Sequence, residues 1–547
     1  MVVVKAAQRG KERRVDTLKE FSKKNFIEQV GILQEVERKN IQEALPELLE
    51  ICRKSDSEDQ IVFMAESALR TLLAKNEQQI MQCLRSGSLN LRKIGVQISG
   101  QQRFESAVPA LTRMVSEKAA SEETVPLIFE TLSALAAIKA PQSKSIFLQY
   151  INHADPLVAE LAIETIGQYG DQSVLDHLFA LIEAAEALDR YAVCDLTTAS
   201  AVEAMGAIGG EKAIRLLASK IHHKNPTVRR LIHRLLAEMG YDAIAFVAPF
   251  LEADNVDGKI MAANILGHMG HNKAGEVLVN AMARGYAENP NVRFAIYEAL
   301  GNIPSIKSLI CLLDGIYETD DLLLLAVVSS LNKHANPGIA KKFKEFFAGA
   351  KGDGSQLVNA IVCAKAASIF RAVYDDAKIA DQILDHIRKS NDKEAVAPFV
   401  QVLEKMQGER PAQDAQTLKA FSISKCEKKL LAVDDSPSIL HFYRSVAQKM
   451  EIDIYTAANG KEALLLLEDG QNYDLIVTDM NMPVMDGIEM TRQVRNNLCL
   501  TEIPIIMATT ESERAQQDLA KKAGADAFMT KPFTPEMLRK TINRFIG

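Results

Sequence analysis

Apolar residues recur at helical spacing over most of the first 400 or so residues of the chain. One stripe has spacings of 3, 1, 3, 1 and 3 and consists of Val228, Leu231, Ile232, Leu235, Leu236 and Met239. Such a stripe is typical of an amphipathic helix. Gly240 is expected to end this helix, and Ile244 and Val247 begin the apolar face of a second one. The pattern predicts helices in pairs from about residue 26 to residue 408.

The helix pairs have a period of about 32 residues. Gly209, Gly240 and Gly270 are 31 and 30 residues apart. The segments Asn225-Pro-Thr-Val-Arg229 and Asn289-Pro-Asn-Val-Arg293 match at a separation of 64 residues, and Asp155-Pro-Leu-Val158 is a weaker copy. A two-helix unit of this size cannot bury its apolar face alone, so it must stack on its neighbours. The sequence therefore predicts an α-solenoid.

With these Asn-Pro openings and glycine-terminated first helices, residues 26 to 408 resemble HEAT repeats of the short bacterial kind. The resemblance implies that Arg229 and Arg293 support stacking between repeats. Arg229, Arg230 and Arg234 beside Lys224 could touch phosphates. They are interpreted as a solvated helix face, although an anion site would be sought there first.

Three histidines in the same region, His222, His223 and His233, could suggest a metal site. Adjacent histidines project to different sides of a helix, and neither an acid nor a cysteine completes the set. We interpret them as residues of a surface loop.

From Lys428 onward the pattern changes to short apolar strands that alternate with amphipathic helices. The expected strands cover 430–433, 452–456, 474–478, 505–508 and 527–529, and the expected helices cover 437–449, 461–468, 488–495, 512–522 and 535–545. This alternation predicts a doubly wound parallel α/β sheet. The expected domains are a helical solenoid with a basic N-terminal cap over 1–408, a linker over 409–427 and an α/β domain over 428–547.

Polar residues follow four of the five predicted strands. Asp434 and Asp435 follow the first strand, Asp479 the third, Thr509 the fourth and Lys531 the fifth. The carboxyl ends of parallel strands meet at one edge of the sheet. Three carboxylates in one place repel each other unless a cation joins them, and their hard oxygens suit Mg²⁺ or Mn²⁺. A carboxylate nucleophile beside a divalent ion and a lysine can accept a phosphoryl group.

On these motifs, residues 428–547 resemble a response-regulator receiver domain of the chemotaxis-regulator kind, with five strands in the order 2-1-3-4-5. The resemblance implies that Asp479 is the phosphoacceptor. It implies a metal site formed by Asp434, Asp435, Asp479 and the backbone carbonyl of Asn481. Lys531 would bind the phosphoryl group.

The same resemblance implies how the phosphorylated state would be sensed and lost. Thr509 and Phe528 occupy the switch positions, and because phenylalanine cannot donate a hydrogen bond, any signal through Phe528 must be packing. Asn481 and Glu511 flank the expected phosphoryl position, a pairing that implies a short-lived phosphoryl group.

The resulting hypothesis is a two-component response regulator. A histidine kinase or a histidine phosphotransfer protein would phosphorylate Asp479, and the solenoid would bind an unknown protein partner under its control. The only catalysis expected is that of the receiver on its own phosphorylation and dephosphorylation. In one alternative the protein is a phosphate sink or relay that the solenoid only localises. In another the solenoid is an enzyme or a nucleic-acid-binding module.

Composition bears on these alternatives. Lys and Arg number 64 against 71 Asp and Glu, which gives a net charge of -7, and the chain has no Trp and 6% aromatic residues. Both features disfavour binding and stacking on nucleic acid. The seven cysteines are scattered, as expected for free thiols in a reducing compartment. No apolar run reaches a membrane span and the start lacks a secretory signal core, so we expect a cytoplasmic protein.

Overall fold

The structure is a computed structural model that describes residues 21–54, 60–74, 76–116, 125–187, 196–349, 354–390, 393–420, 428–469, 472–482, 484–498, 500–509, 514–531 and 533–546. The chain forms two compact units, residues 1–183 with 195–210 and residues 184–194 with 211–547. The basic residues predicted to cap the N-terminus lie mostly outside the described residues, since the description begins at Phe21.

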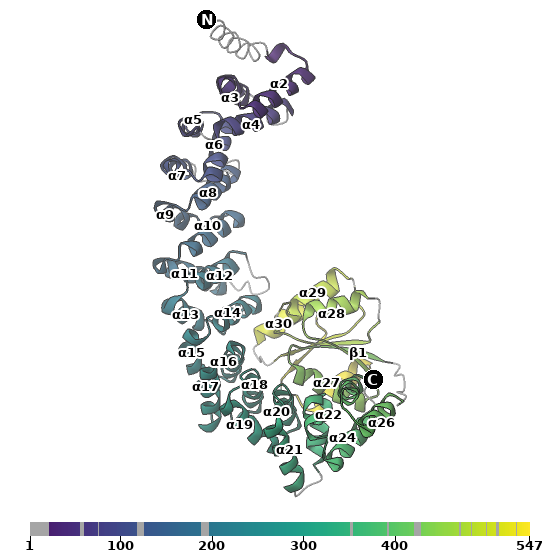
Figure 1. The fold of residues 1–547 in the computed structure, drawn as a ribbon. Helices are drawn as coiled ribbons and strands as arrows, with labels where there is room; N and C mark the ends of the chain where they lie inside the picture. The colour runs from purple at the N-terminus through teal and green to yellow at the C-terminus, as the bar shows by residue number, and fades with distance from the viewer. Residues whose placement is uncertain are drawn as a thin grey trace. The chain divides into compact units, whose positions relative to one another are not determined.

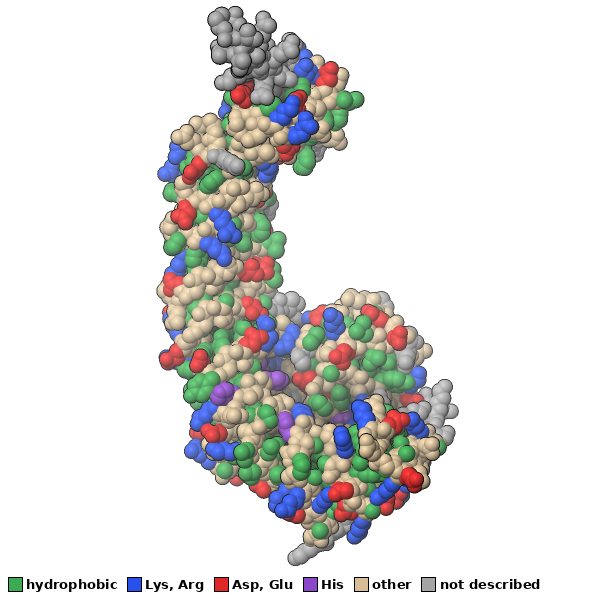
Figure 2. All heavy atoms as spheres, viewed as in Figure 1, with side chains coloured by type: hydrophobic (Ala, Val, Ile, Leu, Met, Phe, Trp, Pro, Cys, Tyr) green, Lys and Arg blue, Asp and Glu red, His purple; other side chains and the backbone are tan. Residues whose placement is uncertain are grey.

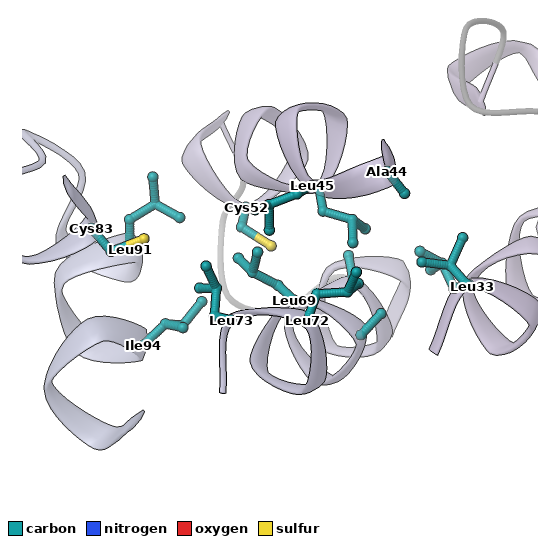
Figure 3. Close-up of a cluster of buried hydrophobic side chains, with 14 of the residues drawn as sticks. Leu33, Ala44, Leu45, Cys52, Leu69, Leu72, Leu73, Cys83, Leu91 and Ile94 are labelled. Atoms are coloured by element: carbon teal, nitrogen blue, oxygen red, sulfur yellow. The ribbon is translucent and has the colours of Figure 1, made fainter. Parts of the chain in front are cut away.

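The first unit is built from paired helices (Figure 1). They are α2 (Phe26–Lys39), α3 (Leu45–Lys54), α4 (Gln60–Leu73), α5 (Glu77–Leu84), α6 (Leu89–Gln102), α7 (Val108–Ser116), α8 (Val125–Ile138), α9 (Lys144–Tyr150), α10 (Pro156–Tyr169), α11 (Leu175–Ala187) and α12 (Leu196–Ile208). Figure 3 shows the core of the first pairs, in which Leu69 and Leu72 of α4 lie opposite Leu45 and Cys52 of α3. Each helix pair contributes apolar side chains of this kind, and stacking of neighbouring pairs joins them into one core.

The second unit also contains helical repeats (Figure 1). Its helices before the sheet are α13 (Gly210–Ala218), α14 (Pro226–Glu238), α15 (Tyr241–Val247), α16 (Val256–Met269), α17 (Asn272–Ala283), α18 (Pro290–Gly301), α19 (Ile306–Asp314), α20 (Asp321–Asn332), α21 (Pro337–Gly349), α22 (Ser355–Cys363), α23 (Ala367–Val373), α24 (Ala377–Ser390), α25 (Lys393–Glu404) and α26 (Glu409–Lys419). On the face that Figure 2 shows, basic and acidic side chains are interspersed.

The repeated Asn-Pro motif starts first helices. The side-chain oxygen of Asn225 accepts hydrogen bonds from the backbone N–H groups of Thr227 and Val228, and Asn289 accepts one from Asn291. The proline takes the first helical position, where no backbone partner exists for an N–H group. Gly240 and Gly270, with φ angles of 57° and 63°, follow first helices in the left-handed backbone region that glycine adopts easily.

Two of the histidines that we interpreted as surface-loop residues bind backbone groups of the fold, so that interpretation is wrong for them: His223 is buried and His233 is half-buried. His223 is 2% exposed, and its Nδ1 accepts the N–H of Asn225 at 3.1 Å. The Nε2 of His233 lies 2.9 Å from the carbonyl oxygen of Ile221. Both rings therefore satisfy backbone groups in the turn before α14.

The linker predicted over residues 409–427 is helical in its first part. Residues 409–419 form α26, which packs against α25. Its buried Pro411, Ala415 and Leu418 lie on one face at spacings of four and three residues. Pro411 is the third residue of the helix, where its missing N–H breaks no intrahelical bond. Residues 421–427 lie outside the described residues, and the domain boundaries remain a prediction.

The C-terminal part of the second unit is a five-stranded parallel sheet in the order β2-β1-β3-β4-β5. The strands are β1 (Lys429–Val433), β2 (Asp453–Ala457), β3 (Leu475–Asp479), β4 (Ile505–Thr509) and β5 (Ala527–Thr530), and the helices are α27 (Pro437–Lys449), α28 (Gly460–Glu468), α29 (Gly487–Asn496), α30 (Arg514–Ala523) and α31 (Pro535–Ile546). The predicted fold class, HEAT-like helical repeats followed by this doubly wound sheet, is confirmed.

The sheet is joined to the repeats of its own unit through α27, which packs against α20 and α22 (Figure 1). None of the helices within the described ranges is long and apolar enough to cross a membrane.

Candidate functional site

Three carboxylates and one lysine meet at the carboxyl edge of the sheet. Asp434 follows β1 and Asp479 is the last residue of β3, so the parallel register brings both to one edge. One oxygen from each of Asp434, Asp435 and Asp479 lies within 4.8 Å of the others. The Nζ of Lys531, which follows β5, lies 2.5 Å from Asp434 Oδ2 and 2.9 Å from Asp479 Oδ1. The sequence predicted this convergence.

The cluster is strained electrostatically without a cation. Burial raises the pKa of Asp434 to about 7, with Lys531 acting against the shift. Part of Asp435 reaches the surface, but the protein packed around its carboxyl group, together with Asp434 and Asp479, raises its pKa well above the usual range. Burial alone would lower the pKa of Lys531, but Asp434 and Asp479 outweigh it and raise that pKa. Excess negative charge in a confined space favours a bound divalent cation.

Three of the remaining predicted site residues, Thr509, Asn481 and Phe528, lie within the described part of the chain. Thr509 is the last residue of β4 and is fully buried, and its carbonyl oxygen accepts the backbone N–H of Lys531 at 2.6 Å. The backbone N–H of Asn481 lies 3.3 Å from Asp479 Oδ2. Phe528 on β5 packs against a cluster that contains Met480, the residue after Asp479, and Met507 of β4. Glu511 lies outside the described residues.

Helix α14 of the repeats contacts the β3–α29 loop beside Asp479. Arg229 donates from Nη2 to Asn481 Oδ1 at 2.8 Å. Arg230 donates from Nη1 to the carbonyl oxygen of Met482 and to Asp486 Oδ2, both at 3.3 Å. Asp486 caps α29 with its other carboxylate oxygen. The interpretation of Arg229 and Arg230 as a solvated helix face is therefore wrong, because this sheet edge covers them.

Helix α18 makes two further contacts with the same edge. Ser436 donates its hydroxyl hydrogen to Glu298 Oε1 at 2.5 Å and accepts the N–H of Ile439, as the cap of α27. Burial raises the pKa of the Glu298 carboxyl, although the hydrogen bond from Ser436 opposes the shift. Asn291 donates from Nδ2 to the carbonyl oxygen of Lys531 at 3.3 Å. The loops after β1, β3 and β5 are thus all in contact with repeat helices.

These repeat residues differ in how clearly the sequence marks them as candidates. Arg229 and Arg230 stood out as the first place to seek an anion site, because they are adjacent on one helix. Glu298 and Asn291 carried no such signal, since one charged residue on an amphipathic helix is ordinary. Asn291 does occupy the position equivalent to Thr227 in the two matching motifs, and Thr227 Oγ1 lies 3.4 Å from Asp486 Oδ2. Only the fold brings these positions to the sheet.

Comparisons with known proteins match both parts of the chain. Residues 430–543 match the response regulator receiver domain, and residues 244–332 match HEAT repeats. Over 120 residues, 22% of this chain, the sequence is 36% identical to chemotaxis protein CheY1 of Helicobacter pylori, and the match covers 97% of that protein. A CheY homolog of Campylobacter jejuni is also 36% identical over 120 residues, with 92% covered. The alkaline phosphatase synthesis transcriptional regulatory protein PhoP of Bacillus subtilis is 36% identical over 119 residues, which cover 22% of this chain and 48% of that protein.

Proposed function

Because the chain belongs, through its C-terminal part, to the response-regulator receiver family, we propose that it is a two-component response regulator phosphorylated on Asp479, with the HEAT repeats as its output. The observation that carries the proposal is the position of Lys531, whose Nζ lies within ion-pair distance of both Asp434 and Asp479. A carboxylate beside a fixed positive charge supports Asp479 as the proposed nucleophile.

The carboxylate cluster fits a magnesium ion. Asp434, Asp435 and Asp479 each offer one hard oxygen within a 4.8 Å span, and the backbone carbonyl of Asn481 is the fourth proposed ligand. When bound, Mg²⁺ or Mn²⁺ would neutralise phosphoryl charge that the carboxylates would otherwise repel. The buried Lys531 would hold a phosphoryl oxygen from the side of Asp479 Oδ1.

In the proposed reaction, a carboxylate oxygen of Asp479 attacks the phosphorus of a phosphohistidine on a histidine kinase or a histidine phosphotransfer protein. A P–O bond forms as the P–N bond breaks, and the imidazole nitrogen keeps the electron pair and takes up a proton. Hydrolysis reverses the modification: water attacks the phosphorus, the Asp479 carboxylate leaves, and inorganic phosphate and a proton are released. Asn481 would help to orient that water, which is consistent with a short-lived phosphoryl group.

The signal would leave the site through Thr509 and Phe528. Thr509 ends β4 beside Asp479, so its hydroxyl can turn toward a phosphoryl oxygen. Phe528 packs against a cluster that includes Met480, next to Asp479, and Met507 on β4. A turn of Thr509 would therefore change the packing at β4, α30 and β5. The repeats would transmit the change to a protein partner whose identity the chemistry of the site does not specify.

Phosphorylation by a small acyl phosphate tests the proposal. The full chain with Mg²⁺ and acetyl phosphate is expected to gain the mass of one phosphoryl group, whereas Asp479→Asn is expected to gain none. Lys531→Ala is expected to reduce incorporation strongly while Mg²⁺ still binds. Equal incorporation in the wild type and in Asp479→Asn would rule out Asp479 as the phosphoacceptor.

A further inference from the structure

We propose that Arg229, on HEAT-repeat helix α14, is a ligand of the phosphoryl group on Asp479, so that the repeats bind the phosphorylated site directly. The inference rests on the proposed function and adds to it a phosphate contact from outside the receiver. It makes the repeats a sensor of phosphorylation as well as its output.

One residue, Asn481, contacts both Arg229 and the phosphoacceptor Asp479. Its Nη2 donates to Asn481 Oδ1 at 2.8 Å, and the backbone N–H of the same Asn481 lies 3.3 Å from Asp479 Oδ2. Lys531 lies on the other carboxylate oxygen, Oδ1, at 2.9 Å. The oxygens of a phosphoryl group on Asp479 would lie between these donors, with Lys531 on one side and Asn481 and Arg229 on the other.

The guanidinium group of Arg229 is held in place for this contact. Arg229 is 4% exposed, and its Nη1 donates to the carbonyl oxygen of His223 at 2.8 Å. That bond fixes one NH₂ group of the guanidinium and directs the other toward the β3–α29 loop. The acceptor on the loop is a neutral amide oxygen, and an arginine binds phosphate oxygens more strongly than neutral ones. A small turn of the Asn481 side chain would exchange the amide for a phosphoryl oxygen.

The second copy of the motif separates this role from a structural one. Arg293 occupies the position of Arg229 in the other Asn-Pro-x-Val-Arg segment, and it also donates to the carbonyl oxygen of the residue six positions earlier, Ala287. Its Nη1 pairs with Glu318, a residue of the repeats, at 3.3 Å. The motif therefore supplies the backbone contact in both copies, and in Arg229 the other arm of the fork reaches the receiver.

The neighbouring contacts place the phosphoryl contact in a wider interface. Arg230 binds the same loop through Asp486, and Asn291 and Glu298 bind the loops after β5 and β1. New negative charge at Asp479 would be attracted to Arg229 across this interface. Phosphorylation is therefore expected to strengthen the docking of the receiver on α14.

Binding of beryllofluoride, a non-covalent phosphoryl analogue, tests the role of Arg229 in the full chain. With Mg²⁺ present and binding followed by fluorine NMR, Arg229→Gln is expected to weaken beryllofluoride binding by about tenfold or more, as for loss of a charge-assisted hydrogen bond. Arg293→Gln loses the matching backbone contact, but among the described residues Arg293 bonds to Ala287 and Glu318 of the repeats, so this variant is expected to stay within about twofold of the wild type. Arg229→Lys, which keeps the charge and loses the fork, is expected to lie between them.

The outcomes separate this inference from the proposed function. Equal affinities for Arg229→Gln and Arg293→Gln, or for Arg229→Lys and the wild type if Arg229→Gln does not fold, would overturn the role of Arg229 and leave phosphorylation intact. A wild-type chain that binds no beryllofluoride, or binding that survives Asp479→Asn, would overturn the proposed function itself.

Discussion

At the scale of single residues, charge decides what the sheet edge can do. Lys531 is shared between Asp434 and Asp479, so it offsets only part of the carboxylate charge. The identity of this cluster was predictable from sequence because each member follows an apolar strand, and parallel strands end together. Glu298 was not predictable, because nothing in the sequence of an amphipathic helix states which partner its polar face will meet.

Histidine burial leads to a prediction about acid stability. Burial lowers the pKa of His233 to about 4, so the folded chain keeps this ring neutral while the unfolded chain protonates it near pH 6.5. The unfolded state therefore binds more protons as the pH falls through 6.5, and stability declines until the folded pKa is reached. Between about pH 7.5 and pH 5, the wild type is expected to lose about 2 kcal/mol more than His233→Gln.

The measurement is amide hydrogen exchange in α14, corrected for intrinsic rates, at both pH values. His441, whose pKa burial lowers to about 3, contributes in the same direction and is unchanged in the variant. Parallel pH profiles for the wild type and His233→Gln would contradict the assignment of His233 as a buried neutral ring.

At the scale of elements, neighbouring first helices approach closely where glycine faces alanine. A Cβ added to Gly167 on α10 would lie 2.9 Å from the Cα of Ala204 on α12, and one added to Gly267 on α16 would lie 2.7 Å from that of Ala299 on α18. The period of the repeats was predictable from glycines that end helices. These glycines inside helices were not, because their reason is a neighbour in the next repeat.

Gly167→Ala is expected to destabilise the first unit by about 1–2 kcal/mol, because overpacking outweighs the gain in helix propensity. Gly31→Ala is the matched control: Gly31 is exposed on α2, an added Cβ meets nothing within 4 Å, and the variant is expected to gain about 0.5–1 kcal/mol. Differential scanning calorimetry of the full chain should place the two variants on opposite sides of the wild type. A Gly167→Ala transition at or above that of wild type would contradict the close helix contact.

At the scale of the whole molecule, the second unit joins its helical repeats to the sheet through the loops after β1, β3 and β5. The predicted order of parts along the chain is confirmed, with helical repeats before a receiver-type sheet. The contacts of Arg229, Arg230, Asn291 and Glu298 with the sheet join residues more than 130 positions apart. The periodic pattern of nearby residues carries no information about contacts at that separation. The sequence therefore predicted the two folds but not the contacts between them.

The central claim is that a phosphoryl group on Asp479 is sensed by the repeats. Hydrogen exchange of the full chain with Mg²⁺, with and without beryllofluoride, tests it most directly. We expect beryllofluoride to slow exchange of backbone amides in α14 of the wild type, because new charge at Asp479 is attracted to Arg229 on that helix, and to change nothing in Asp479→Asn. Exchange that slows around β3 and β4 in the wild type while α14 stays unchanged would contradict the claim.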